Sequence, residues 1–295
     1  MRIAIVTCST LLDLAPGDRL FADALRYRDA ETVAIAWDDP AAAWEAFDAI
    51  VLRSPWDYFH QLTRFKAWLD RLESLRCLVI NPIETVRWNS HKRYLLQLEQ
   101  RGCAIPATRL VPRGDARPLA AHLAGTGWAR TVIKPAVSAG AWRTMRLEGA
   151  PTPADEEAFA TTLKAGDVVL QEYLEEVATG GEWSLMFFDG RFSHAVLKRP
   201  AAGDFRVQRD VGGSVDAASP PAPVSAAATT ALAALRVPAI YARIDLVETA
   251  RGVLLMEAEL IEPYLFLEQH PPAAAAFADA VKRSLATSTR SAARR

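Results

Sequence analysis

The sequence predicts an α/β protein in which a doubly wound parallel-sheet N-terminal domain precedes two α+β lobes. Three observations support this fold class. Within residues 1–82, four short apolar runs alternate with helical patterns, as is typical of parallel strands joined by helices. Residues 106–174 alternate shorter strand and helix patterns, and residues 175–287 contain two hairpin signals.

The apolar runs of the N-terminal domain are IAIV, TVAIAW, AIVLRS and CLVINP, and the helical patterns between them are DRLFADALRYR, AAAWEAFD and TRFKAWLDRLES. Sheets of this kind bind ligands beyond the carboxyl ends of their strands. The segment RSPWDY, residues 53–58, follows the strand that carries Val51 and Leu52. This position makes RSPWDY a candidate binding loop.

Residues 83–105 are expected to form connecting helices. Ser90 is a candidate N-cap for the helical pattern HKRYLLQLEQR, and Gly102 is a candidate stop. In residues 106–174 the strand patterns TVIKP, WRTMRLE and VVLQEYL surround a loop, SAGA, and a helix, EEAFATTLKAG. This region is predicted to be a small lobe.

The first hairpin signal is EWSLMFFDGRFSHAVLKRP, in which Asp189 and Gly190 supply the turn chemistry. The second pairs YARIDLVETARG with the run that ends in MEAELIEP. Side chains two apart on a strand share a face. If the register agrees, the charged side chains of the second hairpin meet on one side, namely Arg243, Asp245, Glu257 and Glu259.

Such alternation also fits an ordinary hairpin with one face in water. Two carboxylates about 4 Å apart repel by roughly 4 kcal/mol at an effective dielectric near 20. Three acids in one patch therefore favour a bound cation, and Mg²⁺ is a natural candidate because it accepts a few carboxylates together with phosphate oxygens and water.

Composition excludes several classes of protein. The chain has 295 residues, 51 % of them hydrophobic and 23 % charged, with a formal net charge of −1. No basic excess favours nucleic acid, and no apolar run is long enough to span a bilayer. The three cysteines form no C-x-x-C and favour a reduced cytoplasm. The basic segment STRSAARR, residues 288–295, is expected to be a flexible tail.

Common catalytic fingerprints are absent from the sequence. No G-x-G-x-x-G follows the first strand, and there is no G-x-x-x-x-G-K-[ST], H-E-x-x-H or G-x-S-x-G. What remains is a set of lysines and arginines that precedes the acidic hairpin, namely Lys92 on the connecting helix, Lys134 and Lys198 at strand ends, and Arg206. They belong to an ordered series of short motifs: Lys92, IKP, QEYL, GEWS, LKRP, GDFR, GG, RID and E-x-E.

This ordered series resembles the ATP-grasp superfamily, especially its glutathione synthetase and D-alanine–D-alanine ligase branches, over most of residues 83–265. The resemblance implies a small lobe, residues 106–174, that closes as a lid over ATP, and a large lobe, residues 175–287. The implied nucleotide contacts are Lys134 and Lys198 at the phosphates, Lys92 near the nucleotide, Gln171, Glu172, Tyr173 and Leu174 at adenine, Glu182 at the ribose, and Ser138 and Gly140 in the loop over the phosphates.

The resemblance also implies that Asp245, Glu257 and Glu259 bind Mg²⁺. Arg206 and Arg243 would stabilise the transferring phosphoryl group and the tetrahedral intermediate. Two departures stand out: the family usually has E-x-N where this chain has E-x-E, and its phosphate loop has more glycines than SAGA. The extra carboxylate is expected to attract a divalent ion more strongly.

RSPWDY, WNSHKRYL, GEWSLMFF, FSHAVLKRPAAGDFRVQ, YARIDL and ELIEP together are similar to a narrower ATP-grasp group that includes the D-cycloserine-forming ligase. That similarity implies an acyl-phosphate ligase that cyclises O-ureido-D-serine. We expect Arg53 to clamp the substrate carboxylate, with Trp56 and Tyr58 as pocket walls, although pairing with Asp57 and ordinary packing would also explain these residues.

Three alternatives stay open at this point. The chain could join another small amino acid to an amine, it could bind ATP without catalysis, or it could be a magnesium nuclease. The neutral net charge argues against the nuclease. A small-molecule amino-acid substrate is the expected partner, with no nucleic acid or membrane, and a homodimer is allowed.

Overall fold

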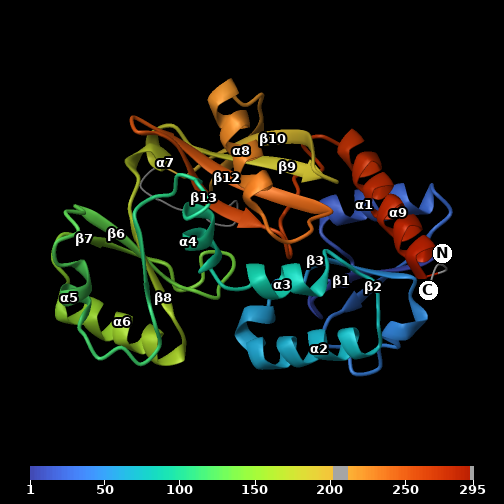
Figure 1. Ribbon diagram of the computed structural model, residues 1–295, viewed down its shortest axis with the longest axis horizontal. Coiled ribbons are helices and arrows are strands. Elements are labelled where there is room, and N and C mark those ends of the chain that lie inside the picture. The colour runs from blue at the N-terminus through green and yellow to red at the C-terminus, as the bar shows by residue number, and fades with distance from the viewer. Residues whose placement is uncertain (202–211, 293–295) are drawn as a thin grey trace.

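The computed structural model describes residues 1–201 and 212–292, with side chains described as far as 287. Three sheets organise the molecule (Figure 1). They lie within residues 1–82, 106–174 and 175–287, in the same order as the predicted segments. The mixture of one parallel and two antiparallel sheets agrees with the predicted fold class.

The N-terminal sheet is parallel and has the strand order β2-β1-β3-β4. Its strands are β1 (Arg2–Thr7), β2 (Glu31–Ala36), β3 (Ala49–Ser54) and β4 (Val79–Ile80), and its α-helices are α1 (Pro16–Arg26) and α2 (Leu62–Ser74). The run AAAWEAFD forms only a short 3-10 helix, η1 (Trp44–Ala46), and a second, η2 (Tyr58–Gln61), leads into α2.

Alternate residues of the N-terminal strands enter two different cores. Ile3 and Ile5 of β1 pack with α1 on one face, whereas Ala4 and Val6 pack on the opposite face with the aromatic side chains of α2. A strand that is buried on both faces must be apolar at nearly every position, which explains the continuous run IAIV.

Two short helices, α3 (Ile83–Asn89) and α4 (Tyr94–Glu99), connect the N-terminal domain to the small lobe. The prediction that Ser90 caps the second helix is wrong. Ser90 ends α3 instead, and its hydroxyl donates to the Arg87 carbonyl at 2.8 Å. Gly102 follows α4 with φ of +91°, a backbone conformation that suits glycine.

The small lobe has an antiparallel sheet of order β5-β8-β6-β7. Its elements are β5 (Thr108–Val111), α5 (Leu119–Leu123), β6 (Arg130–Pro135), β7 (Met145–Glu148), α6 (Pro153–Ala165) and β8 (Val168–Glu172). Its own core is built around Phe159 and Leu170. The short α7 (Glu175–Thr179) then leads into the large lobe.

The large lobe has an antiparallel sheet of order β11-β10-β9-β12-β13. Its strands are β9 (Glu182–Phe188), β10 (Arg191–Arg199), β11 (Ser214–Ala217), β12 (Tyr241–Thr249) and β13 (Gly252–Glu259), and α8 (Ala222–Ala234) covers one face. Both predicted hairpins, β9–β10 and β12–β13, are present.

The last helix, α9 (Pro272–Ala292), returns to the N-terminal domain and lies beside α1 (Figure 1). Phe277 of α9 stacks on Phe21 of α1, with 4.0 Å between ring centroids. The segment predicted to be a flexible tail begins at residue 288, and α9 continues to Ala292. None of the described helices is long and apolar enough to cross a membrane.

Buried polar side chains join the N-terminal domain to the large lobe. The Asn81 amide donates to the carbonyls of Tyr241 and Leu260 at 2.8 Å each. Arg53 at the end of β3 donates to Asp18 of α1 at 2.9 Å and to the Pro263 carbonyl at 2.7 Å. Because these groups are desolvated and paired, each fixes the relative position of the elements it connects.

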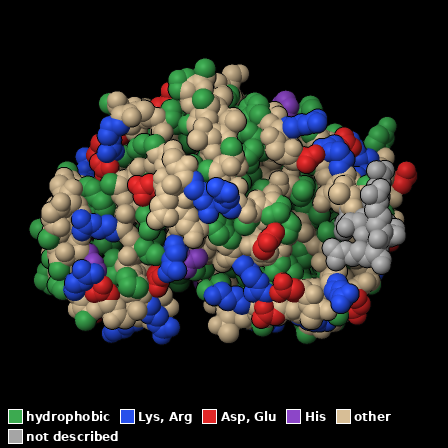
Figure 2. Space-filling model, viewed as in Figure 1, with side chains coloured by type: hydrophobic (Ala, Val, Ile, Leu, Met, Phe, Trp, Pro, Cys, Tyr) green, Lys and Arg blue, Asp and Glu red, His purple; other side chains and the backbone are tan. Residues whose placement is uncertain are grey.

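The face shown in Figure 2 carries Lys, Arg, Asp and Glu side chains interspersed, and it is indented between the small lobe and the N-terminal domain. Mixed charge of this kind gives no broad single-sign field on that face. The functional chemistry is therefore to be sought in the interior between the lobes.

The Arg53–Asp18 ion pair should be a strong determinant of stability, because only 1 % of the Arg53 side chain and 5 % of the Asp18 side chain are exposed. In Arg53→Met the Asp18 carboxylate stays buried without its cation, so we expect the free energy of unfolding to fall by about 3–5 kcal/mol in urea denaturation. Arg26→Met, which breaks the exposed ion pair with Asp23, should cost less than about 1 kcal/mol. Equal losses in the two variants would contradict the assignment.

Candidate active site

One cavity of about 770 Å³ lies where the three sheets meet. This volume is within the usual range for small-molecule sites of about 300–1,000 Å³. All the sequence-predicted site residues line it except Arg53 and Arg206. The lining members are Trp56, Tyr58, Lys92, Lys134, Ser138, Gly140, Gln171, Glu172, Tyr173, Leu174, Glu182, Lys198, Arg243, Asp245, Glu257 and Glu259. Arg206 lies outside the described residues.

The β12–β13 register places the four charged residues of the second hairpin on one face. Arg243 lies opposite Glu259, and Asp245 lies opposite Glu257. On the other side of β12, Ser184 of β9 lies opposite Asp245. The four charged side chains thus share one face, as the alternation predicts. The turn at Gly252, whose φ is +111°, does not set this pairing alone, because the register shifts by one residue between Asp245 and Leu246. Without this irregularity Asp245 would lie opposite Met256.

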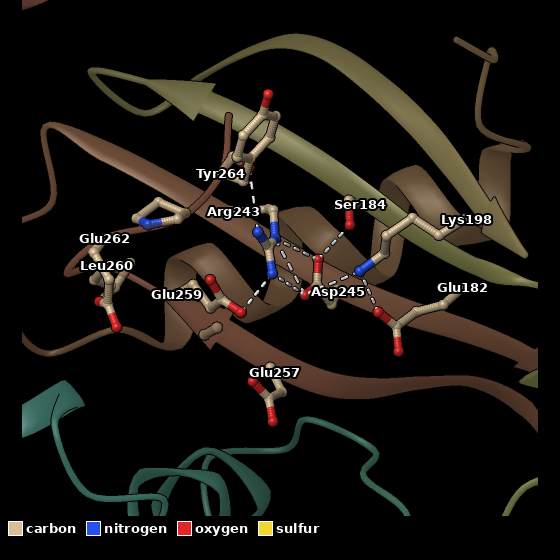
Figure 3. A network of polar contacts seen from close by, with 12 residues as sticks. Glu182, Ser184, Lys198, Arg243, Asp245, Glu257, Glu259, Leu260, Glu262 and Tyr264 are labelled. Carbon is tan, nitrogen blue, oxygen red and sulfur yellow. Dashed lines mark hydrogen bonds and ion pairs between the residues drawn. The ribbon is translucent and has the colours of Figure 1, made fainter. Parts of the chain in front are cut away.

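Asp245 is at the centre of a buried charge network (Figure 3). It accepts from Arg243 Nη2 at 2.9 Å and from the Ser184 hydroxyl at 2.6 Å, and it lies 3.5 Å from Lys198 Nζ. Lys198 also pairs with Glu182, and Arg243 also pairs with Glu259. Burial alone would raise the pKa of Asp245, but these cations hold it below its ordinary value.

A second group of cations converges on Glu257. Its Oε1 accepts from Lys92 Nζ at 3.0 Å and from Lys134 Nζ at 3.2 Å. Burial opposes ionisation of Glu257, yet the two ammonium groups hold its pKa well below the usual range. Burial lowers the pKa of Lys134, because the carboxylate shared with Lys92 offsets only part of the desolvation. The lysines are therefore desolvated cations that hold a single carboxylate oxygen between them.

Glu259 and Glu262 differ from the other acids. Burial, with the nearby charge of Asp245, raises the pKa of Glu259 to about 7 despite Arg243. Burial and the Glu259 charge raise the pKa of Glu262 to about 8. Acidic side chains whose affinity for protons is this high are unusual outside functional sites.

The residues predicted to bind magnesium offer the hard oxygen donors that this ion prefers. In the described part of the chain, however, no three Asp, Glu, His or Cys side chains are grouped so as to hold a metal ion. Asp245, Glu257 and Glu259 each pair with a lysine or arginine. Their carboxylate oxygens suit Mg²⁺, but the lysine and arginine side chains that now pair with them would have to move before the ion could bind. The metal site therefore stays a prediction.

The segment expected to hold adenine lies where the small lobe joins the large one. Gln171 pairs with Thr108 of β5 and with Val132 of β6. The Glu172 N–H donates to the Ala107 carbonyl at 2.9 Å, and its carboxylate pairs with Arg251 at 2.8 Å. The strand that enters the small lobe and the strand that leaves it are thus hydrogen-bonded to each other at this hinge.

The loop that follows β6 crosses toward the N-terminal domain. Gly140 and Ala141 have φ of +58° and +57°, and the Ser138 hydroxyl donates to the Pro135 carbonyl at 3.1 Å. Trp142 then packs against Phe59 and His60, with ring centroids 5.5 and 5.1 Å away. Sequence reasoning missed Trp142 and Phe59, because no periodic pattern links two loops from different lobes.

Arg53 is not brought together with the other predicted site residues. It does not line the main cavity, and its guanidinium binds Asp18 and the Pro263 carbonyl. The neighbouring aromatic residues do line the cavity: Trp56 Nε1 donates to the Glu262 carbonyl at 3.0 Å, and Tyr58 packs on Phe65. Glu262 itself was not predicted, although the ELIEP motif contains it.

Comparison with known proteins supports a common family. Residues 3–81 match the family model described as the N-terminal domain of the D-cycloserine synthetase DcsG. The cycloserine biosynthesis protein DcsG of Streptomyces lavendulae is 34 % identical over 266 residues, which cover 84 % of this chain and 87 % of that protein.

Solved structures show the same relationship. The crystal structure of D-cycloserine synthetase DcsG superimposes with a TM-score of 0.88 at 30 % identity, covering 97 % of this chain and 100 % of that one. The D-alanine–D-alanine ligase of Bacillus anthracis complexed with ATP shares the fold, with a TM-score of 0.68 at 16 % identity and 99 % coverage of each chain. The chain is an ATP-grasp ligase and belongs to the DcsG family.

Proposed function

We propose that the protein uses Mg-ATP to convert the carboxylate of O-ureido-D-serine into an acyl phosphate, which a nitrogen of the same molecule then attacks to close a ring. The observation that carries this proposal is the convergence of Lys92, Lys134, Lys198 and Arg243 with three acids in one cavity. The names of two relatives, a cycloserine biosynthesis protein and a D-cycloserine synthetase, support the choice of product.

The cation arrangement suits phosphoryl transfer, a reaction that depends mainly on positioning and on charge neutralisation. Lys92 and Lys134 share one oxygen of Glu257. ATP phosphates would offer these lysines several oxygens, and Glu257 would then be released to bind a divalent ion with Asp245 and Glu259. When bound, Mg²⁺ supplies further neutralisation of the phosphate oxygens. Nucleotide and metal binding would therefore be coupled through the same two lysines.

In the first chemical step, a substrate carboxylate oxygen attacks the γ-phosphorus and ADP leaves. In the second, the nitrogen attacks the acyl carbon, loses its proton, and inorganic phosphate leaves. Arg243 lies on the same face as Asp245 and Glu259 and is placed to stabilise the charge that develops on the acyl oxygen. Ring closure through the oxygen-bound ureido nitrogen leaves a carbamoyl group, which water must remove as carbon dioxide and ammonia to give D-cycloserine.

The cavity walls would protect the acyl phosphate from water. Trp142 from the small lobe packs on Phe59 and His60 of the N-terminal domain, so the loop that follows β6 contacts the N-terminal domain. Enclosure of this kind excludes water and holds the nitrogen close to the acyl carbon.

The proposal is tested by ADP release with Mg-ATP against a panel of D- and L-amino-acid carboxylates, O-ureido-D-serine included, with products identified by mass. Release with O-ureido-D-serine and the mass of D-cycloserine support it. Release only with another amino acid and an added amine would indicate an intermolecular ligase, and ATP binding without release for any substrate would indicate a non-catalytic protein.

Glu257→Gln should separate nucleotide binding from turnover. Loss of the carboxylate charge frees Lys92 and Lys134 for phosphate, so ATP affinity without magnesium, measured by calorimetry, should be unchanged or higher. Magnesium-dependent kcat should fall by about 100-fold or more, because metal-assisted neutralisation is worth several kcal/mol. Glu157→Gln, at an exposed site on α6, is the control. Wild-type turnover in Glu257→Gln would remove Glu257 from the metal site.

Lys134→Ala should weaken ATP binding. A hydrogen bond to a charged group contributes about 1.5–3 kcal/mol, so the KM for ATP should rise by roughly 10- to 150-fold. Lys164→Ala removes an exposed lysine from α6 of the same lobe and should leave the ATP titration unchanged. If the two variants titrate alike, Lys134 does not contact the nucleotide.

A further inference from the structure

Glu262 is the one acid in the cavity lining that forms no ion pair within the described residues. The other lining acids, Glu172, Glu182, Asp245, Glu257 and Glu259, each pair with a lysine or arginine. Glu262 instead shares a hydrogen bond with the Tyr58 phenol, a neutral group. Glu262 is half-buried, and a carboxyl group that is partly removed from water and forms no ion pair is costly unless a ligand completes its interactions.

The backbone that carries Glu262 is held by three side-chain donors in succession. Trp56 Nε1 donates to the Glu262 carbonyl at 3.0 Å, and Arg53 Nη2 donates to the Pro263 carbonyl at 2.7 Å. Arg243 Nη1 donates to the Tyr264 carbonyl at 3.2 Å. Because consecutive peptide groups are fixed from both the N-terminal domain and β12, the Glu262 side chain has a preorganised position at the cavity wall.

The surroundings of Glu262 favour a cationic group. Trp56 and Tyr264 stack with their ring centroids 6.0 Å apart, and both line the cavity with Tyr58. Aromatic faces attract ammonium groups, and more strongly where water is excluded. Burial and the Glu259 charge make Glu262 prefer its protonated form, with its pKa raised to about 8. An arriving ammonium group would reverse that preference by favouring the carboxylate.

We infer that Glu262 receives the α-ammonium group of the amino-acid substrate, with Trp56, Tyr58 and Tyr264 as the walls of this subsite. The assignment rests on the proposed function and specifies which group of the substrate the protein recognises. Arg243 contacts the Tyr264 carbonyl, two residues beyond Glu262, so a positive and a negative side chain lie near each other at this end of the cavity. An α-amino acid presents the matching pair of charges on one carbon.

This subsite also explains why Arg53 is buried away from the cavity. Its contact with the Pro263 carbonyl makes Arg53 a positioning residue for the loop that carries Glu262. The N-terminal domain thus contributes to substrate selection through the backbone carbonyls that Arg53 and Trp56 hold.

The test compares O-ureido-D-serine with its counterpart in which hydrogen replaces the α-amino group, in ADP-release kinetics. The wild-type protein should prefer the amino acid by at least about 30-fold in kcat/KM, since breaking a buried charge pair costs about 2 kcal/mol or more. Glu262→Gln should lose most of this preference through a higher KM for the amino acid, while the KM for ATP stays unchanged. Glu262→Asp, which keeps the charge, should retain part of the preference.

Glu248→Gln is the matched control, because Glu248 lies on β12 outside the cavity lining and a glutamine can still accept from Trp183 Nε1. It should keep the wild-type preference. An active wild-type protein whose Glu262→Gln variant still prefers the amino acid would overturn the subsite alone. A wild-type protein that releases no ADP with any amino acid would overturn the proposed function, and the subsite with it.

Discussion

The buried charges on β9, β10, β12 and β13 are the constraint on which the rest of the site depends. Asp245 cannot stay ionised in the interior without Arg243 and Lys198. The two strands that carry these residues, β10 and β12, must therefore keep their registers on β9, which lies between them, and the pairing of β12 with β13 places Glu257 and Glu259 in the cavity. A fully paired network of this kind fixes geometry before any ligand arrives.

The N-terminal domain completes the site by contacts that are mostly indirect. Asn81 holds the backbone at Tyr241 and Leu260, and Arg53 holds it at Pro263. These contacts join the beginning and the end of the β12–β13 hairpin to a separate parallel sheet. In consequence, two residues that do not line the cavity help to determine where the acids of β13 and the following loop point.

Much of the fold and part of the site could be predicted from the sequence, for identifiable reasons. The period-two alternation was enough to predict that Asp245 and Glu257 share a face, but the one-residue register shift between Asp245 and Leu246 that sets them opposite each other has no signal in the sequence. Arg53 could not be placed, because its partners Asp18 and Pro263 lie 35 and 210 positions away and neither is marked by a local pattern. Contacts between lobes, such as Trp142 on Phe59, arise from packing that no periodicity describes.

The paired strands at the root of the small lobe have a mechanical consequence. Thr108 of β5 and Gln171 of β8 are register partners. The chain segment that enters the small lobe and the segment that leaves it are therefore paired side by side at the lobe boundary. Any swing of the lobe turns about this line. A base bound at Gln171–Leu174 would lie close to this line and move little, whereas the loop of residues 138–142, beyond the opposite end of β6, would move farther. Small rotations of the small lobe would thus preserve the contacts between residues 171–174 and adenine, while they change the distance between the loop and the phosphates.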